Sequence, residues 1–228
     1  MSEENPVGFT LFAILAGPRP RAAAPRTEAL AALSAEIDAL AGAGVTLRGL
    51  YDVTGMRSDA DLMLWLHLAP GDEDASALQK ALRALRRTEV LRDFSCTWSA
   101  MGVHREAEFN KRHIPGYMRD EPARDWLCLY PFVRSHEWYL LPDEERAAML
   151  GDHGRKGAAF RDVVANTVSA FALSDYEWLL PLESDNLVSL VDLMRALRAT
   201  DARRHVREEV PFHTGRRIAV ADLQEVLG

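Results

Sequence analysis

The sequence predicts an α+β protein in which one order of strands and helices occurs twice. Residues 7–103 follow the order strand, helix, strand, strand, helix, strand, and residues 126–218 repeat it. The stretch ALRRT at residues 84–88 recurs as ALRAT at residues 196–200, at the same point of each half. We therefore expect two fused ferredoxin-like (βαββαβ) units, whose strands close into a subunit of the dimeric α+β barrel type.

The elements of the first half follow from apolar patterning and from stop signals. Residues 7–17 (VGFTLFAILAG) are apolar and β-rich enough for a buried strand. Apolar residues recur at helical spacing over residues 27–43, and Gly44 supplies a stop. Two strands, an amphipathic helix and a further strand are then expected at residues 45–53, 60–69, 75–87 and 91–103.

The second half gives the same series. A strand region at residues 126–141 leads into a helix over residues 143–160. The first turn of that helix carries three carboxylates, which suit the positive end of a helix dipole. A β-branched strand, another strand, a helix and a last strand follow at residues 162–173, 176–183, 185–199 and 206–218.

A charged stretch, residues 105–124, separates the halves and is interrupted by Pro115 and Pro122. It is either a plain linker or an ordered loop over a site. Its reactive side chains are unusual for a spacer: Lys111, Arg112, His113 and Tyr117. We expect a first unit at residues 1–104, a connecting loop over the site, and a second, ligand-binding unit at residues 125–228.

Composition narrows the class of protein. The net charge of -7 argues against general nucleic-acid affinity, which needs a basic face. Two cysteines, Cys96 and Cys128, make no disulfide framework or metal quartet. The acidic start of the chain lacks the basic region of a signal peptide, and no apolar run reaches the length of a membrane span. We expect a cytoplasmic protein.

The helix at residues 143–160 carries an unusual glycine pattern. Gly151, Gly154 and Gly157 recur every three residues, with His153 among them. Because a glycine inside a helix costs about 1 kcal/mol relative to alanine, three of them require a reason. Alone, His153 would fit a surface histidine. A flat ligand that approaches the glycines while an imidazole projects toward it explains the pattern better, so we predict a porphyrin site.

Several motifs together carry a family resemblance. They are YPFVR at residues 130–134, WY at 138–139, HG at 153–154 with Gly157, and DYEW at 175–178. Their combination resembles the chlorite dismutase-like superfamily, and within it the coproheme decarboxylases of the actinobacterial type. The resemblance implies a pair of ferredoxin-like units per subunit and a homopentameric assembly.

The resemblance also implies roles for individual residues. His153 matches the proximal iron ligand, Tyr130 the tyrosine that becomes a radical, and His113 the distal histidine that takes a proton from peroxide. Arginine binds carboxylates in bidentate fashion, which suits Arg134 to the porphyrin propionates. The residues expected to bind the porphyrin are Tyr130, Phe132, Arg134, Trp138, Asn166, Lys111 and Arg112.

Asn166 falls where chlorite-degrading members carry an arginine, which weakens the case for chlorite chemistry. It alternates with Val164 and Val168 on what should be an apolar strand face. Such a residue either meets a hydrogen-bond partner inside the protein or faces a ligand. We expect Asn166 to face the ligand.

The implied activity is a hydrogen-peroxide-dependent decarboxylation of two propionates of coproheme (iron coproporphyrin III) to vinyl groups. Coproheme is both substrate and redox centre, heme b is the product, and the reaction proceeds through a tyrosyl radical at Tyr130. A transient contact with a ferrochelatase is a further expectation. The alternatives are a heme b peroxidase or chlorite-degrading enzyme, and a non-catalytic heme carrier or sensor that needs His153 alone.

Overall fold

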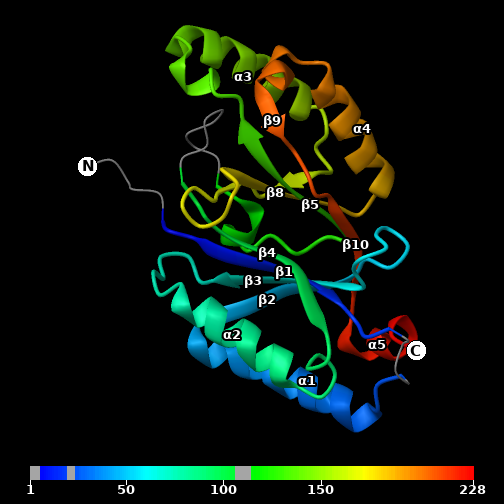
Figure 1. Cartoon of the computed structure of the whole chain (residues 1–228). Helices are drawn as coiled ribbons and strands as arrows, with labels where there is room; N and C mark the ends of the chain where they lie inside the picture. The colour runs from blue at the N-terminus through cyan, green and yellow to red at the C-terminus, as the bar shows by residue number, and fades with distance from the viewer. Residues whose placement is uncertain (1–5, 20–23, 106–113) are drawn as a thin grey trace. The chain divides into compact units, whose positions relative to one another are not determined.

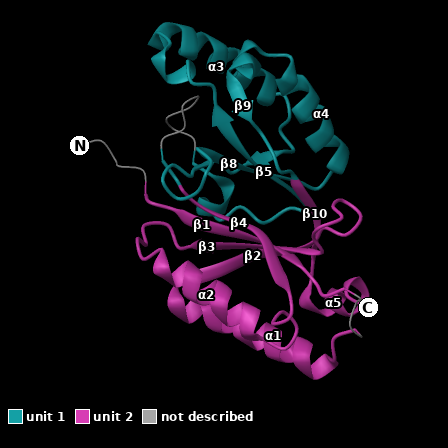
Figure 2. Ribbon diagram, viewed as in Figure 1, with its two compact units in different colours: residues 1–5, 104–212 teal, residues 6–103, 213–228 magenta. Residues whose placement is uncertain are grey.

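The computed structural model describes residues 6–19, 24–105 and 114–228, which divide into two compact units. One unit comprises residues 6–103 and 213–228, and the other comprises residues 104–212 (Figure 2). The unit boundaries predicted from the sequence assigned the last sixteen residues to the second unit. In the structure they group with the first half, because the strand that they contain pairs with β2.

The unit of residues 6–103 and 213–228 is an antiparallel sheet with two long helices (Figure 1). Its strand order is β4-β1-β3-β2-β10. The elements are β1 (Phe9–Ala16), α1 (Thr27–Ala39), β2 (Val45–Asp52), β3 (Leu62–Leu68), α2 (Ser76–Arg87), β4 (Ser95–Val103), β10 (His213–Ile218) and α5 (Leu223–Val226).

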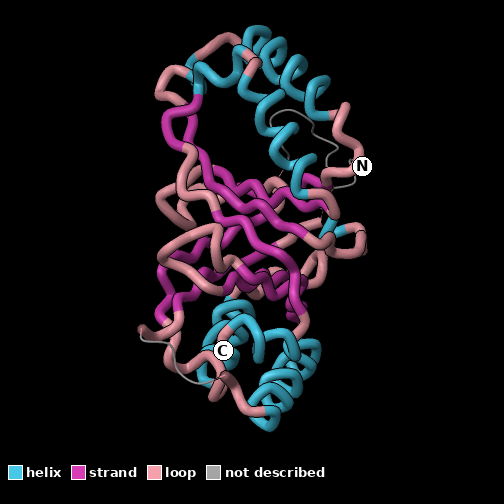
Figure 3. Tube along the Cα trace, turned by 90° about the vertical axis from the view of Figure 1, so that its right-hand side faces the viewer, coloured by secondary structure: helices cyan, strands magenta, loops and turns pink. Residues whose placement is uncertain are grey.

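Alternation along β1 builds the core of this unit. Leu11, Ala13 and Leu15 point to one face of the sheet and share a cluster of buried residues with apolar side chains of α1 and α2. Figure 3 shows the helices of each unit on one face of its strands. Gly44 ends the first helical segment with a φ of 69°, the left-handed conformation that glycine adopts without strain.

The unit of residues 104–212 has a similar order of elements, with three strands in place of two between its helices. A three-residue 3-10 helix at Trp138–Leu140 leads into α3, and a five-residue 3-10 helix at Asp201–His205 follows α4. The strands and helices are β5 (Trp126–Arg134), α3 (Asp143–Gly157), β6 (Val164–Ala165), β7 (Val168–Ser169), β8 (Trp178–Ser184), α4 (Leu187–Arg198) and β9 (Val206–Glu208). β5 and β8 pair antiparallel, β9 pairs with β5, and the short β6 and β7 pair with β8.

Two predicted strands of the second half differ from the structure. The strand expected at residues 162–173 is reduced to β6 and β7, which flank residues 166–167. The strand expected at residues 206–218 is divided into β9 and β10, with Pro211 between them. Proline cannot donate to a strand ladder, which explains the break. Among the described residues, no helix is long and apolar enough to cross a membrane.

Candidate functional site

A pocket in the unit of residues 104–212 collects several of the predicted site residues. Strand alternation places Tyr130, Phe132 and Arg134 on one face of β5, and all three line the pocket. His153 reaches the same pocket from α3. The empty space is about 690 Å³, a figure that includes the part open to solvent. Most other lining residues are apolar, among them Leu150, Trp178, Leu180, Met194 and Leu197.

The charged residues of α3, the helix that carries His153, are placed to stabilise that helix. The first turn of α3 holds Asp143, Glu144 and Glu145, and its last turn holds Arg155 and Lys156, so both ends complement the helix dipole. Leu150 is the buried residue of this helix. Outside this residue, α3 is held in place by its contacts with α4 and with the 3-10 helix at Asp201–His205.

The electrostatics of the pocket favour a neutral imidazole at position 153. Burial lowers the pKa of His153 below its usual value, and the positive charge of Arg134 lowers it further. A neutral imidazole is the form that coordinates a metal ion. His153 Nδ1 lies 3.5 Å from Thr200 Oγ1, so Nε2 remains as the nitrogen available to a metal.

The three glycines of α3 are not explained by close packing of the chain around them. A Cβ added to Gly154 would meet nothing within 4 Å among the atoms described. One added to Gly157 would touch Leu197 at 3.9 Å, an ordinary contact, and one added to Gly151 would lie 3.5 Å from the Arg155 guanidinium. The space that they leave beside α3 is what a ligand approaching this helix requires.

Tyr130 is a buried residue that lines the pocket. Its ring stacks on Phe212 with centroids 4.6 Å apart and an interplanar angle of 15°. Burial raises the pKa of the Tyr130 phenol far above its usual value, and Cys128 and Glu209 add to the effect. The phenol is therefore protonated at neutral pH, and its oxidation must release a proton together with the electron.

Arg134 is a buried cation held by aromatic rings. Its guanidinium carbon lies 4.1 Å from the ring centroid of Trp138 and 4.8 Å from that of Phe132. The backbone N–H of Arg134 donates to Glu177 Oε2 at 2.8 Å. Trp138 is fully buried and does not line the pocket, although the sequence predicted that it would. It supports Arg134 instead.

Charged residues at the end of α4 complete the pocket, and sequence reasoning missed them. Arg198 and Arg203 both donate to the Glu209 carboxylate, the Arg198 contact being 2.6 Å. All three line the pocket, which thus holds three arginines with Arg134. The sequence suggests only a solvated helix end for Arg203, because no motif shows that the chain turns back toward β5 at this point.

The expectation for Asn166 is wrong, since its side chain is turned into the protein. It is 0% exposed and does not line the pocket. Its Oδ1 accepts from the backbone N–H of Tyr117 at 3.0 Å, and its Nδ2 donates to Glu183 Oε2 at 3.0 Å. Internal hydrogen bonds, the alternative to a ligand contact, thus account for a polar residue on this face. Three further predicted residues, Lys111, Arg112 and His113, lie outside the described residues.

The donors of this pocket fit an iron porphyrin with carboxylate side arms. A single neutral imidazole projects into a mainly apolar space, and arginines stand beside it. In the described parts of the chain, no group of three or more His, Cys, Asp or Glu residues could hold a bare metal ion. One imidazole suffices when the other iron ligands belong to a macrocycle.

Comparisons with known proteins agree with this chemistry. The family model described as "Chlorite dismutase" matches residues 26–218. The coproheme decarboxylase of Mycolicibacterium smegmatis is 55% identical over 181 residues, which cover 79% of this chain and 77% of that protein. The coproheme decarboxylase of Thermus thermophilus is 28% identical over 213 residues, covering 88% and 83%.

Solved structures confirm the predicted fold class. A mutant chlorite dismutase from Candidatus Nitrospira defluvii superposes with a TM-score of 0.82, covering 97% of this chain and 95% of that one at 21% identity. The same enzyme in complex with imidazole gives a TM-score of 0.81 at 20% identity, covering 96% and 94%. At sequence identities this low, the structural similarity shows a shared fold and nothing about activity.

Proposed function

This chain belongs to the chlorite dismutase family, and on that premise we propose that it is a coproheme decarboxylase. The observation that carries the proposal is that a neutral imidazole, His153, and a buried phenol, Tyr130, line one pocket. Coproheme is the substrate and also the redox centre, and heme b is the product. The relative of this chain from Mycolicibacterium smegmatis is named for the same activity.

The overall reaction at each propionate balances with one peroxide. The propionate, one hydrogen peroxide and one proton become a vinyl group, one carbon dioxide and two waters. The iron of the bound substrate supplies the redox chemistry with peroxide. In this proposal His153 holds the iron through Nε2, and Arg134 pairs with a carboxylate side arm. Two peroxides are consumed for each heme b.

Tyr130 transfers the oxidation to the substrate. The phenol gives up one electron and one proton together, because burial disfavours the phenolate. The radical then takes a hydrogen atom from the β-carbon of the propionate, which restores the phenol. Loss of one further electron and of carbon dioxide would then leave the vinyl group, and the oxidised substrate would take up that electron. Stacking on Phe212 holds the ring in one orientation throughout.

The proton of the incoming peroxide needs an acceptor on the other side of the porphyrin. We propose His113 for this role on the strength of the family resemblance, with Lys111 and Arg112 as further partners of the propionates. Replacing His113 by alanine should leave coproheme binding intact and slow the reaction with peroxide. Unchanged peroxide kinetics would remove His113 from the mechanism.

Mass spectrometry of the protein loaded with coproheme tests the proposal most directly. Stepwise addition of peroxide should convert the ligand in two stages, each with loss of one carboxyl group and one hydrogen. A ligand that stays unchanged would instead favour a heme carrier or sensor. His153→Ala should abolish the conversion while the fold persists. Oxygen release from chlorite under anaerobic conditions would favour a chlorite-degrading enzyme.

We also propose a homopentamer, a cytoplasmic location and a transient contact with a ferrochelatase, all from the family resemblance. Light scattering should give five times the 25.4 kDa mass of the chain. A monomeric mass in solution would contradict the assembly without affecting the chemistry proposed for the pocket.

A further inference from the structure

We infer that Thr200 is a positioning residue for the iron ligand. Its hydroxyl oxygen accepts a hydrogen bond from His153 Nδ1–H and so fixes the ring with Nε2 unprotonated and ready to bind iron. The inference deepens the proposed function and rests on it for the identity of the iron porphyrin. The hydrogen bond itself is a property of the protein without ligand.

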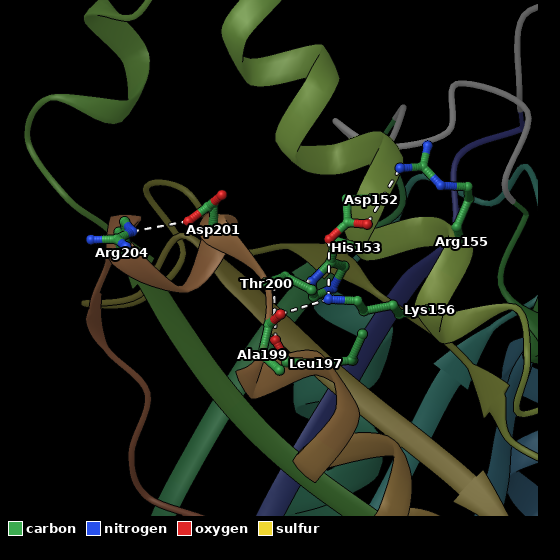
Figure 4. A network of polar contacts seen from close by, with 9 residues as sticks. All are labelled: Asp152, His153, Arg155, Lys156, Leu197, Ala199, Thr200, Asp201 and Arg204. Carbon is green, nitrogen blue, oxygen red and sulfur yellow. Dashed lines mark hydrogen bonds and ion pairs between the residues drawn. The ribbon is translucent and has the colours of Figure 1, made fainter.

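The direction of the hydrogen bond follows from the single proton of the hydroxyl group. Thr200 Oγ1 donates that proton to the backbone carbonyl of Leu197 at 2.9 Å. The same oxygen lies 3.5 Å from His153 Nδ1, toward which it can act only as an acceptor. Nδ1 must therefore carry the ring proton, and Nε2 is left with its lone pair. Figure 4 shows both contacts meeting at Thr200.

A second contact holds α3 and the end of α4 together at this point. Lys156, three residues after His153, donates to the backbone carbonyl of Ala199 at 2.6 Å and also pairs with Asp152 at 3.3 Å (Figure 4). Thr200 is only 6% exposed, so water has little access to its hydroxyl. The imidazole and the hydroxyl are thus set opposite each other by the packing of two helices.

Nearby carboxylates are committed to other partners. Asp152 pairs with Arg155 and Lys156, and Glu209 accepts from Arg198 and Arg203. The acceptor at Nδ1 is therefore a neutral hydroxyl rather than a carboxylate. A ligating histidine commonly donates its second ring N–H to a carboxylate, a backbone carbonyl or water, which sets the tautomer of the ring. In this pocket the Thr200 hydroxyl oxygen takes that place.

Ring-nitrogen NMR of the protein without porphyrin tests the inference first. Wild type and Thr200→Ser, which keeps the hydroxyl, should show His153 protonated at Nδ1. Thr200→Val, which has nearly the same shape without the hydroxyl, should shift His153 toward the Nε2–H tautomer. An Nε2–H tautomer in the wild type would overturn the inference even if the valine variant failed to fold. So would an unchanged tautomer in a folded valine variant.

Titration with two porphyrins then separates this inference from the proposed function. Thr200→Val should bind iron(III) coproporphyrin III about 10-fold more weakly than wild type, the scale usual for partners of metal ligands. Metal-free coproporphyrin III should bind both proteins equally, and Thr200→Ser should restore iron binding. The iron–imidazole stretching band of the reduced complex should move to lower frequency in the valine variant. Equal affinities and bands would overturn the role of Thr200, whereas a wild-type complex that lacks an iron–imidazole band would overturn the proposed function.

Discussion

The guanidinium group of Arg134 lies over Trp138, with its central carbon 4.1 Å from the indole centroid. Only 8% of Arg134 is exposed, yet it lines the pocket. A buried arginine beside an aromatic ring suits the carboxylate side arm that we propose as its partner, because the guanidinium can donate two parallel N–H bonds.

Arg134→Lys should therefore weaken coproheme binding although the charge is kept. The ammonium group loses both the stacking on Trp138 and the bidentate geometry, for which we expect a roughly 10-fold higher Kd, or about 1.4 kcal/mol. Arg155→Lys, an exposed arginine of α3, is the matched control and should bind as wild type does. Quenching of tryptophan fluorescence measures both. Equal Kd values for the two variants would show that Arg134 does not contact a side arm.

Tyr130→Phe should bind coproheme with wild-type affinity and form no vinyl product. Phenylalanine keeps the stacking on Phe212 and removes the O–H bond that the radical step requires. Tyr139→Phe is the control, since that phenol is partly exposed and donates to Glu177. It should convert coproheme normally. Heme b formation by the Tyr130 variant at the wild-type rate would refute the radical assignment.

Asn166→Ala should destabilise the fold and leave porphyrin affinity unchanged. The change removes the acceptor of the Tyr117 N–H and the amide donor to Glu183 Oε2, which should cost about 3 kcal/mol in the free energy of unfolding. Asn186→Ala, at the cap of α4, is the matched change and should cost about 1 kcal/mol. Urea denaturation measures both. If Asn166→Ala has normal stability but does not bind coproheme, Asn166 contacts the ligand after all.

Local signals located most of the fold and four of the residues that line the pocket. Period-two alternation in β5 put Tyr130 and Arg134 on one face, and the charge pattern of α3 marked the helix that carries His153. These features depend on neighbours within a few residues, so the sequence contains them directly. The repeated element order likewise predicted both ferredoxin-like units.

Features made by distant segments could not be predicted in this way. Thr200 and Glu209 reach the pocket only because the chain after α4 folds back over α3 and β5. The direction of Asn166 depends on the interruption between β6 and β7, which lets its side chain reach the carboxylate of Glu183. Neither arrangement follows from hydrophobic periodicity, because that pattern describes single elements and not their contacts.

A last prediction concerns His213, which lies in the unit of residues 6–103 and 213–228. Its ring is 2% exposed, and its centroid is 5.0 Å from that of Trp98. Neither ring nitrogen has a hydrogen-bond partner among the residues that the structure describes. Burial, assisted by the positive charge of Arg57 and opposed by Asp59, lowers the pKa of His213 from 6.5 to about 4.

Stability should consequently fall as the pH is lowered from 6.5 toward 4. In that window the unfolded chain binds a proton at His213 that the folded chain rejects, and the difference amounts to about 3 kcal/mol at the lower end. Above pH 6.5 both states are neutral and the contribution is complete. His153, whose pKa is also lowered, acts in the same direction, so the effect of His213 must be isolated by a variant. His213→Phe keeps an aromatic ring beside Trp98 and should reduce the loss of stability between pH 6.5 and 4 by about 3 kcal/mol. Urea unfolding at a series of pH values measures this difference. The control is His136→Phe, which replaces an exposed histidine. If the free energy of unfolding of His213→Phe and of wild type changes with pH in parallel, protonation of His213 does not destabilise the fold.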